Sequence, residues 1–287
     1  MTDNAHLPVF WIRGSVLDAF KHAAHTGRTP DGSDPWIFLS DTIKAHRNVN
    51  PNLDGPEDQG EFLVSIGSAA AATVAATVAG ISLLTGPLAP LTGLVLGMVG
   101  VQPRTCRVIV VNDTDEDLVP ANMTSVAGMD PTGVAWLDCG LVTAVPAVAT
   151  SSGGWTAVGT VPKRRTMPDG KKAAGVGCYV FQKNLQAMLG FVGTGGVLPF
   201  TARSMTAKAG VGWLVPQRGA SSTATTLDLD GDGGCATLYQ KYIDSRRQET
   251  SIVMGGSAKL VLEATLSDTA AAEATLTACF QPLAPQS

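Results

Sequence analysis

The sequence predicts a mainly β protein, an antiparallel sandwich or barrel, that follows a long uncharged segment. Two observations support this prediction. From residue 106 onward, short apolar runs alternate with clusters of turn-forming residues, which is typical of antiparallel β-folds. Ahead of them, the 42 residues from 62 to 103 contain no charged side chain. Charged residues make up 15% of the chain, whereas soluble domains average about 25%, and the uncharged run accounts for a large part of that deficit.

The composition excludes several classes of protein. The 287 residues carry 24 Asp and Glu against 20 Lys and Arg, a net charge of −4, so no excess of cations is available for general nucleic-acid binding. With 45% hydrophobic residues the chain can form a sizeable core, which excludes wholesale disorder. No GxSxG, P-loop or HExxH motif occurs, and all four histidines lie within the first 46 residues. We therefore expect no enzyme, no cofactor and no metal site.

The cysteines are too widely spaced for a zinc site. None forms a CxxC pair, and their number is odd, which argues against a disulfide framework. We expect them to be small buried hydrophobic residues. The five are Cys106, Cys139, Cys178, Cys235 and Cys279.

Residues 1–60 are richer in charge than the segment that follows, and Gly, Pro and Asp clusters interrupt them. We predict an irregular N-terminal extension with short helices at residues 9–25 and 36–46, and we expect it to be propeptide-like or to mask the next segment. The first residues lack a basic region followed by a long apolar one, so no signal peptide is predicted. We expect a soluble protein that stays in the producing cell until release or leaves it by another route.

Residues 61–103 hold the uncharged run, and its first half has the length of a membrane-crossing helix. Residues 62–84 would extend roughly 34 Å as a helix. Small residues recur at every fourth position from Gly67 to Ala79, a stripe that lets helices approach closely in lipid. Pro87 and Pro90 end this helix before a second short one at residues 91–99. The residues expected to enter the membrane are Phe62, Ile66, Gly67, Ala71, Val74, Ala75, Val78, Ala79, Ile81 and Leu84.

Three interpretations of the uncharged run stay open. It is a segment of a soluble protein that inserts conditionally into a membrane, which we favour. The alternatives are an Ala-rich helix buried against a soluble core and a permanent transmembrane anchor. Ala, Gly, Ser and Thr make the run only weakly hydrophobic, which argues against the anchor.

The β-region opens with an apolar run at residues 106–111, which ends in the acidic turn 112–117. Residues 235–245 predict a short helix, and residues 269–287 a peripheral tail. Residues 228–233 have the spacing of the first half of a calcium loop, but Tyr239 stands where the closing Glu is needed, so an acidic turn is favoured. Further strands are predicted at residues 142–149, 155–161, 175–181, 185–192, 212–215 and 258–266.

A basic hairpin is predicted at residues 163–172. Lys163, Arg164 and Arg165 precede the turn, and Lys171 and Lys172 follow it. A solvated turn is the simpler interpretation of this pattern. Contact with an anionic membrane surface is the alternative.

Several segments resemble, in the same order, parts of one known family. AGVGCYVF at residues 174–181, followed by LQAMLGF at residues 185–191, resembles the central hairpin of the actinoporins, a family of pore-forming cytolysins. VIVVNDTDED at residues 108–117 is similar to their first strand, and GGSAKLVLE at residues 255–263 is similar to their last. LYQKY at residues 238–242 resembles their tyrosine-bearing helix. The resemblance covers residues 65–268.

The resemblance implies a fold and a function. It implies an actinoporin-like antiparallel β-sandwich flanked by short helices, with a membrane-binding domain at residues 104–268. A toxin of this kind binds lipid of the target-cell membrane through the sandwich, inserts its N-terminal helix and assembles into an oligomeric pore. The residues that would line a headgroup pocket for phosphocholine or sphingomyelin are Val176, Pro199, Phe200, Tyr239 and Tyr242, with Trp213 on a membrane-facing loop.

Two alternatives to the pore-forming function remain. Fungal fruit-body lectins resemble the same sandwich, so a protein that binds surface glycans without perforating membranes is the first alternative. The second is a structural or assembly protein whose Ala-rich helix belongs to the core.

Overall fold

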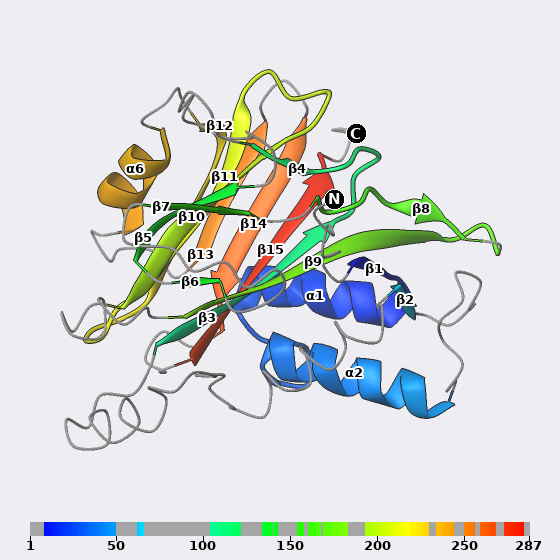
Figure 1. Cartoon of the computed structure of the whole chain (residues 1–287). Coiled ribbons are helices and arrows are strands. Elements are labelled where there is room, and N and C mark those ends of the chain that lie inside the picture. The colour runs from blue at the N-terminus through cyan, green and yellow to red at the C-terminus, as the bar shows by residue number, and fades with distance from the viewer. Residues whose placement is uncertain are drawn as a thin grey trace, which may run out of the picture.

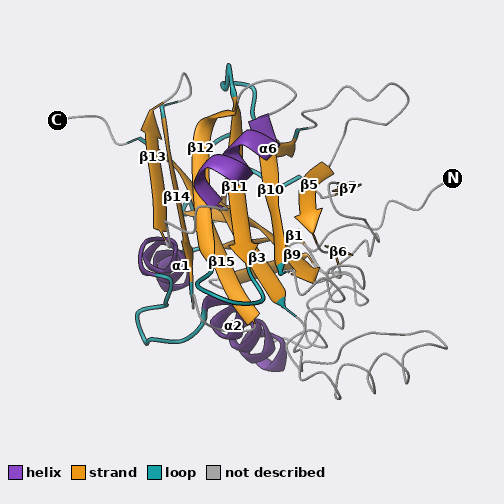
Figure 2. Cartoon of the chain, turned by 90° about the vertical axis from the view of Figure 1, so that its left-hand side faces the viewer, coloured by secondary structure: helices purple, strands orange, loops and turns teal. Residues whose placement is uncertain are grey.

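Two β-sheets pack face to face in the computed structural model, and helices cover both outer faces (Figures 1 and 2). This arrangement confirms the prediction of a mainly β sandwich with short flanking helices. The structure describes residues 9–49, 62–65, 104–121, 134–139, 141–142, 154–157, 160–167, 169–182, 193–229, 234–243, 250–255, 259–267 and 273–283.

The larger sheet has nine strands, and its central strands are apolar on both faces. Its main path runs β13 (Thr250–Gly255), β14 (Leu260–Leu266), β15 (Glu273–Pro282), β3 (Thr105–Asn112), β9 (Lys172–Gln182), β1 (Val9–Ile12) and β2 (Phe62–Ser65). The short strands β6 (Leu141–Val142) and β8 (Arg165–Thr166) also pair with β9. All pairs are antiparallel except β15 with β3, which run parallel. Every residue of β3 is buried, because one face of the strand meets the other sheet and the opposite face meets the helices.

The smaller sheet has six strands. Its path runs β12 (Ser222–Leu229), β11 (Lys208–Val215), β10 (Thr194–Thr201), β5 (Val134–Cys139) and β7 (Gly154–Ala157), with β4 (Val119–Pro120) paired to β10. The core between the two sheets contains aromatic side chains whose rings contact one another. The rings of Phe181 and Trp213 lie 4.3 Å apart, and those of Phe200 and Phe280 lie 5.9 Å apart.

Two helices from the N-terminal region cover the outer face of the nine-stranded sheet. They are α1 (Gly14–Thr26) and α2 (Pro35–Val49), and they lie below that sheet in Figure 1. Phe20 of α1 and Trp36 of α2 are fully buried in a cluster that includes Ile109 and Val111 of β3. The helix at residues 36–46 is confirmed, but the prediction of an irregular extension is wrong for residues 9–49, because this region supplies a central part of one core.

The side chain of Asp34 joins α2 to the end of the sheet. Its Oδ1 accepts hydrogen bonds from the N–H of Trp36 at 2.9 Å and from the hydroxyl of Thr275 at 3.0 Å. Its Oδ2 accepts a hydrogen bond from the hydroxyl of Ser267 at 2.6 Å. One carboxylate therefore accepts from the first turn of a helix and also binds β15 and the residue that follows β14.

A short helical segment covers the six-stranded sheet. It consists of α6 (Gly234–Leu238) followed by the π-helical turn η1 (Tyr239–Ile243), so the predicted helix at residues 235–245 is confirmed over residues 235–243. Glycines of the sheet make room for it. A Cβ on Gly212 would lie 2.2 Å from the Cδ1 of Ile243, and one on Gly195 would lie 2.4 Å from the hydroxyl of Tyr239.

The structure corrects three further expectations about secondary structure. Residues 9–12 form a strand rather than the start of a helix, and Phe62–Ser65 form β2 rather than the first turn of a membrane helix. Residues 269–287 are not a peripheral tail, because β15 lies between β14 and β3. Of the residues expected to enter the membrane, only Phe62 lies in a described segment. In the part of the chain that the structure describes, no helix is both long and apolar enough to cross a membrane.

Candidate functional site

The residues proposed for a headgroup pocket occupy three different layers of the fold. Val176 is buried on the face of β9 that meets the N-terminal helices, and Phe200 is buried between the two sheets. Tyr239 packs with Val197 outside the six-stranded sheet, and alternation along β10 places buried Pro199 on that same outer side. The structure therefore brings Pro199 and Tyr239 to one face but does not bring them together with Val176 or Phe200. The side chain of Tyr242 is outside the described residues.

Trp213 lies inside the sandwich rather than on a loop. It belongs to β11, its side chain has no exposed surface, and its ring packs on Phe181. In this conformation Phe200 and Trp213 join the two sheets and present no surface to a ligand. A headgroup role for Pro199, Tyr239 and Tyr242 stays a prediction.

The described thiols are part of the core. Cys106, Cys178, Cys235 and Cys279 are free and buried, as the sequence predicts. Burial raises the pKa of the Cys235 and Cys279 thiols to about 12. These two groups are therefore protonated near neutral pH and are poor nucleophiles.

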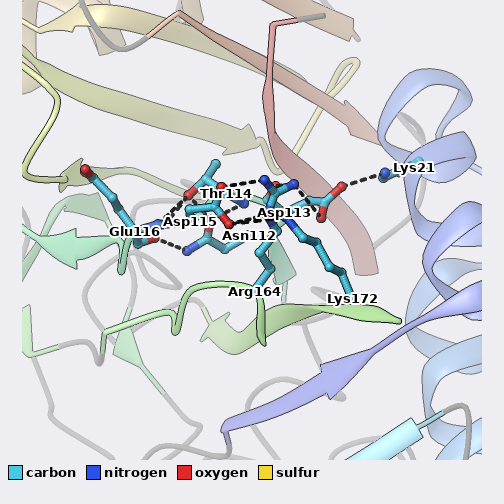
Figure 3. Close-up of polar contacts among 8 residues, drawn as sticks. All are labelled: Lys21, Asn112, Asp113, Thr114, Asp115, Glu116, Arg164 and Lys172. Carbon is cyan, nitrogen blue, oxygen red and sulfur yellow. Dashed lines mark hydrogen bonds and ion pairs between the residues drawn. The ribbon is translucent and has the colours of Figure 1, made fainter. Parts of the chain in front are cut away.

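The acidic turn after β3 and the basic hairpin lie against each other (Figure 3). Asn112, the last residue of β3, begins the acidic turn, and its side-chain amide binds both the turn and the chain that enters the hairpin. The Nδ2 of Asn112 donates to the carbonyl oxygens of Glu116 at 2.9 Å and Pro162 at 3.1 Å, while its Oδ1 accepts from the hydroxyl of Thr114 at 2.7 Å. The buried amide thus closes the turn and fixes the chain that enters the hairpin.

Ion pairs extend this contact on both sides. Asp115 accepts two hydrogen bonds from the guanidinium of Arg164 and lies 3.7 Å from the Nζ of Lys172. The hydrogen bonds from Arg164 hold the pKa of the Asp115 carboxyl below its ordinary value. Asp113 pairs with Lys21 of α1 at 2.7 Å. The acidic turn therefore connects the N-terminal helix to the hairpin, and it neutralises Arg164.

The hairpin itself has a defined turn and extends past the edge of the sandwich (Figure 1). Arg165 and Thr166 of β8 pair with Ala173 and Lys172 of β9. The N–H of Met167 donates to the carbonyl oxygen of Lys171 at 2.8 Å, and Gly170 adopts a φ of 78°, a conformation that favours glycine. The sequence-based prediction of a basic hairpin is confirmed.

Trp11 supports the hairpin from strand β1, a role that the sequence reading missed. Its Nε1 donates to the carbonyl oxygen of Lys163 at 3.1 Å, and the guanidinium carbon of Arg165 lies 4.1 Å from the centroid of its ring. Met167 is buried beside Trp11. The contact joins residues more than 150 positions apart, so no local pattern in the sequence indicates it.

Comparisons with known proteins identify no family. No family model matches the sequence, and no curated protein matches it. Among solved structures, the lipid binding protein Nakanori is 10% identical with a TM-score of 0.33, over 83% of this chain and 95% of that one. The Xerocomus chrysenteron lectin XCL is 10% identical with a TM-score of 0.33, over 63% of this chain and 100% of its own. IP-1A from Alcaligenes faecalis is 12% identical with a TM-score of 0.29, over 63% of this chain and 93% of that one. Likenesses of this size establish neither a shared family nor a shared function.

Proposed function

We propose that this protein binds membrane lipid and inserts its uncharged run into the bilayer, where several copies form a pore. One observation carries the proposal: the 42-residue run without a charge is attached to the sandwich at both ends. Its first four residues form β2 at the edge of the nine-stranded sheet. It ends at Pro103, just before β3 in the middle of that sheet.

The two attachment points set the path that the run can take. Strands β1 and β9 lie between β2 and β3, and Ser65 lies level with Val110, five residues past the start of β3, so the attachment points are about 22 Å apart. The run is therefore internal to the fold in sequence, because β1, α1 and α2 precede it and pack into the sandwich. A run held at both ends enters a bilayer and returns to the same side. This differs from the free N-terminal helix that the family resemblance implies.

The lengths of the two halves suit this path. Residues 66–84 would reach roughly 28 Å as a helix, close to the ~30 Å of a bilayer core. Residues 85–103 form a second stretch of the same length, which includes three prolines. This stretch brings the chain back to the side of the bilayer from which it entered. A charged side chain at mid-bilayer costs about 2.5–3.5 kcal/mol on insertion scales, and this run contains none.

Dye release from vesicles tests the proposal. We expect the full chain to release dye from vesicles that contain sphingomyelin or an anionic lipid. Ala75→Asp places a charge in the run and is expected to abolish release without preventing vesicle binding. Ala220→Asp adds the same charge to an exposed loop position of the sandwich and is expected to release dye like the unchanged chain.

Two results would overturn the proposal. One is the absence of release from every vesicle composition at micromolar protein. The other is equal release by Ala75→Asp and the unchanged chain. Binding to immobilised glycans without release from any vesicle would instead support the lectin alternative.

A further inference from the structure

We infer that the basic hairpin, together with Trp11, is the surface by which this protein docks on an anionic lipid bilayer. This inference rests on the proposed membrane function and names the lipid class that the sandwich recognises first. The surface consists of Trp11, Lys163, Arg165, Lys171 and Lys172.

Local charge supports an anionic partner. Residues 163–172 carry five cations and one carboxylate, a net charge of +4 for this segment in a chain whose overall net charge is −4. The acidic turn beside it adds four carboxylates, and each of them has a partner: Asp113 pairs with Lys21, Asp115 with Arg164, Glu116 accepts from the N–H of Ser204, and Asp117 accepts from the N–H of Lys163. The carboxylate of Asp169 forms an ion pair with Arg13, and Arg164 forms an ion pair with Asp115. The remaining excess of positive charge lies at the projecting end of the molecule.

Three of these cations are available to a partner. Lys163, Arg165 and Lys171 form no ion pair with any residue that the structure describes, and both lysines are exposed. Lys172 is exposed too, with 54% of its side chain accessible, and its pairing distance of 3.7 Å to Asp115 is long. A flat anionic surface can therefore meet several lysines without first breaking a close ion pair.

Trp11 and the turn make this surface rigid and suited to the boundary between water and lipid. The Arg165 guanidinium stacks on the partly exposed Trp11 ring. A backbone hydrogen bond of the turn holds Lys171, and Asp117 accepts a hydrogen bond from the backbone N–H of Lys163. Tryptophan favours the interface because its ring is apolar and its N–H is polar. Here the N–H is bound to the Lys163 carbonyl oxygen.

The position of the surface connects it to the uncharged run. Trp11 pairs directly with Leu63 of β2, the strand from which the run continues. Docking through Trp11 and the hairpin therefore brings Phe62 and Leu63 close to the bilayer surface, and the run continues from the end of β2 that lies farther from the hairpin. A nucleic acid would use the same cations, but it would gain nothing from the neighbouring uncharged run, so a bilayer is the partner that accounts for both features.

Vesicle binding with matched variants tests the inference. Binding is measured by co-sedimentation with phosphatidylcholine vesicles and with vesicles that also contain phosphatidylserine, at low and high NaCl. We expect the unchanged chain to prefer the anionic vesicles and to be released by salt. Lys163→Gln with Lys171→Gln is expected to weaken binding about 25-fold, or about fivefold for each charge.

The control removes two charges at the opposite end of the molecule. Arg28 follows the far end of α1, and Arg218 follows Gln217, whose carbonyl oxygen binds Arg104 ahead of the first residue of β3. Both are exposed, and the hairpin lies at the last residue of β3. Arg28→Gln with Arg218→Gln is expected to keep the binding of the unchanged chain. Thermal melts of both double variants show that folding is unaffected.

The outcomes separate this inference from the proposed function. Equal binding of the hairpin variant and the control, no preference for phosphatidylserine, or tighter salt-sensitive binding to a DNA or RNA oligonucleotide would overturn the docking surface. If the unchanged chain still releases dye in that case, the proposed function survives without it. Hairpin-dependent binding with no dye release from any vesicle would support the docking surface and overturn pore formation.

Discussion

The two outer faces of the sandwich are covered in opposite ways. The nine-stranded sheet is covered by α1 and α2, which come from the start of the chain and bury large side chains against β3, β9 and β15. The six-stranded sheet is covered by α6 and η1, which follow β12 within a few residues and lie close over glycines. The difference shows that one cover is held by large side chains packed against side chains of the sheet, and the other by side chains that lie directly on glycine positions of the sheet.

Removing α1 and α2, which cover the nine-stranded sheet, is expected to have the largest effect. A chain that lacks residues 1–60 loses β1, α1 and α2, and it exposes Ile109, Val111 and Val176, which are fully buried in the intact fold. We expect it to be insoluble or to lack a cooperative thermal transition. A chain that lacks only residues 1–8 keeps every helix and strand that the structure describes and is expected to melt like the full chain. A cooperative melt of the larger deletion would show that the N-terminal helices are an appendage after all.

Adding one methyl group to Gly212 tests how closely α6 and η1 pack on the six-stranded sheet. The Cβ of Gly212→Ala would meet the Cδ1 of Ile243 at 2.2 Å, and overpacking of this kind costs about 1–3 kcal/mol. Ile243→Val removes that terminal methyl group, so the pair is expected to cost less than the sum of the two single changes. Denaturant unfolding of the unchanged chain, the two single variants and the double variant measures the energetic coupling between the two positions. Strict additivity would contradict the close contact between η1 and β11.

Removing the Asp34 carboxylate tests how α2 is held. Asp34→Ala deletes the acceptor of the Trp36 N–H and of the Ser267 and Thr275 hydroxyls. We expect a loss of about 1–2 kcal/mol in the free energy of unfolding. Asp34→Asn keeps an oxygen at the same place and is expected to lose less. Equal losses in the two variants would mean that charge, rather than hydrogen bonding, holds the helix.

The smallest effect is expected at the acidic turn, which belongs to neither cover. Arg164 lowers the pKa of Asp115 below its ordinary value of 3.8, so the pair stabilises the fold at neutral pH. Its contribution is lost as the pH falls through the lowered pKa. Arg164→Gln is expected to raise that pKa towards the ordinary value, which NMR titration of the Asp115 carboxyl measures. An unchanged titration curve would contradict the ion pair.

The parts of the fold that the sequence predicts are those with a local pattern. The apolar run at residues 106–111 predicts β3, and the cations around a Pro-Asp-Gly turn predict the hairpin. A short helix is predicted at residues 36–46, where α2 lies. In each case the residues that determine the structure are close neighbours in the chain.

Other parts depend on partners far away in the sequence. Residues 9–12 form a strand because β9 and β2 offer them hydrogen bonds on both sides, although their own pattern suggests a helix. Trp213 and Phe200 are aromatic residues of the kind expected in a membrane-binding cluster, yet the nine-stranded sheet packs on both and buries them. Trp11 gives no signal of its role, because Lys163 and Arg165 reach it only through the folded sheet.

The place of β15 has a consequence for how the protein is made. This strand follows all other described strands in sequence, yet it fills the middle of the larger sheet between β14 and β3. While the ribosome is still adding it, β14 and β3 each present an unpaired edge that can join another chain. We therefore expect the nascent protein to depend on chaperones until synthesis passes Pro282, and chains that stop before Glu273 to aggregate.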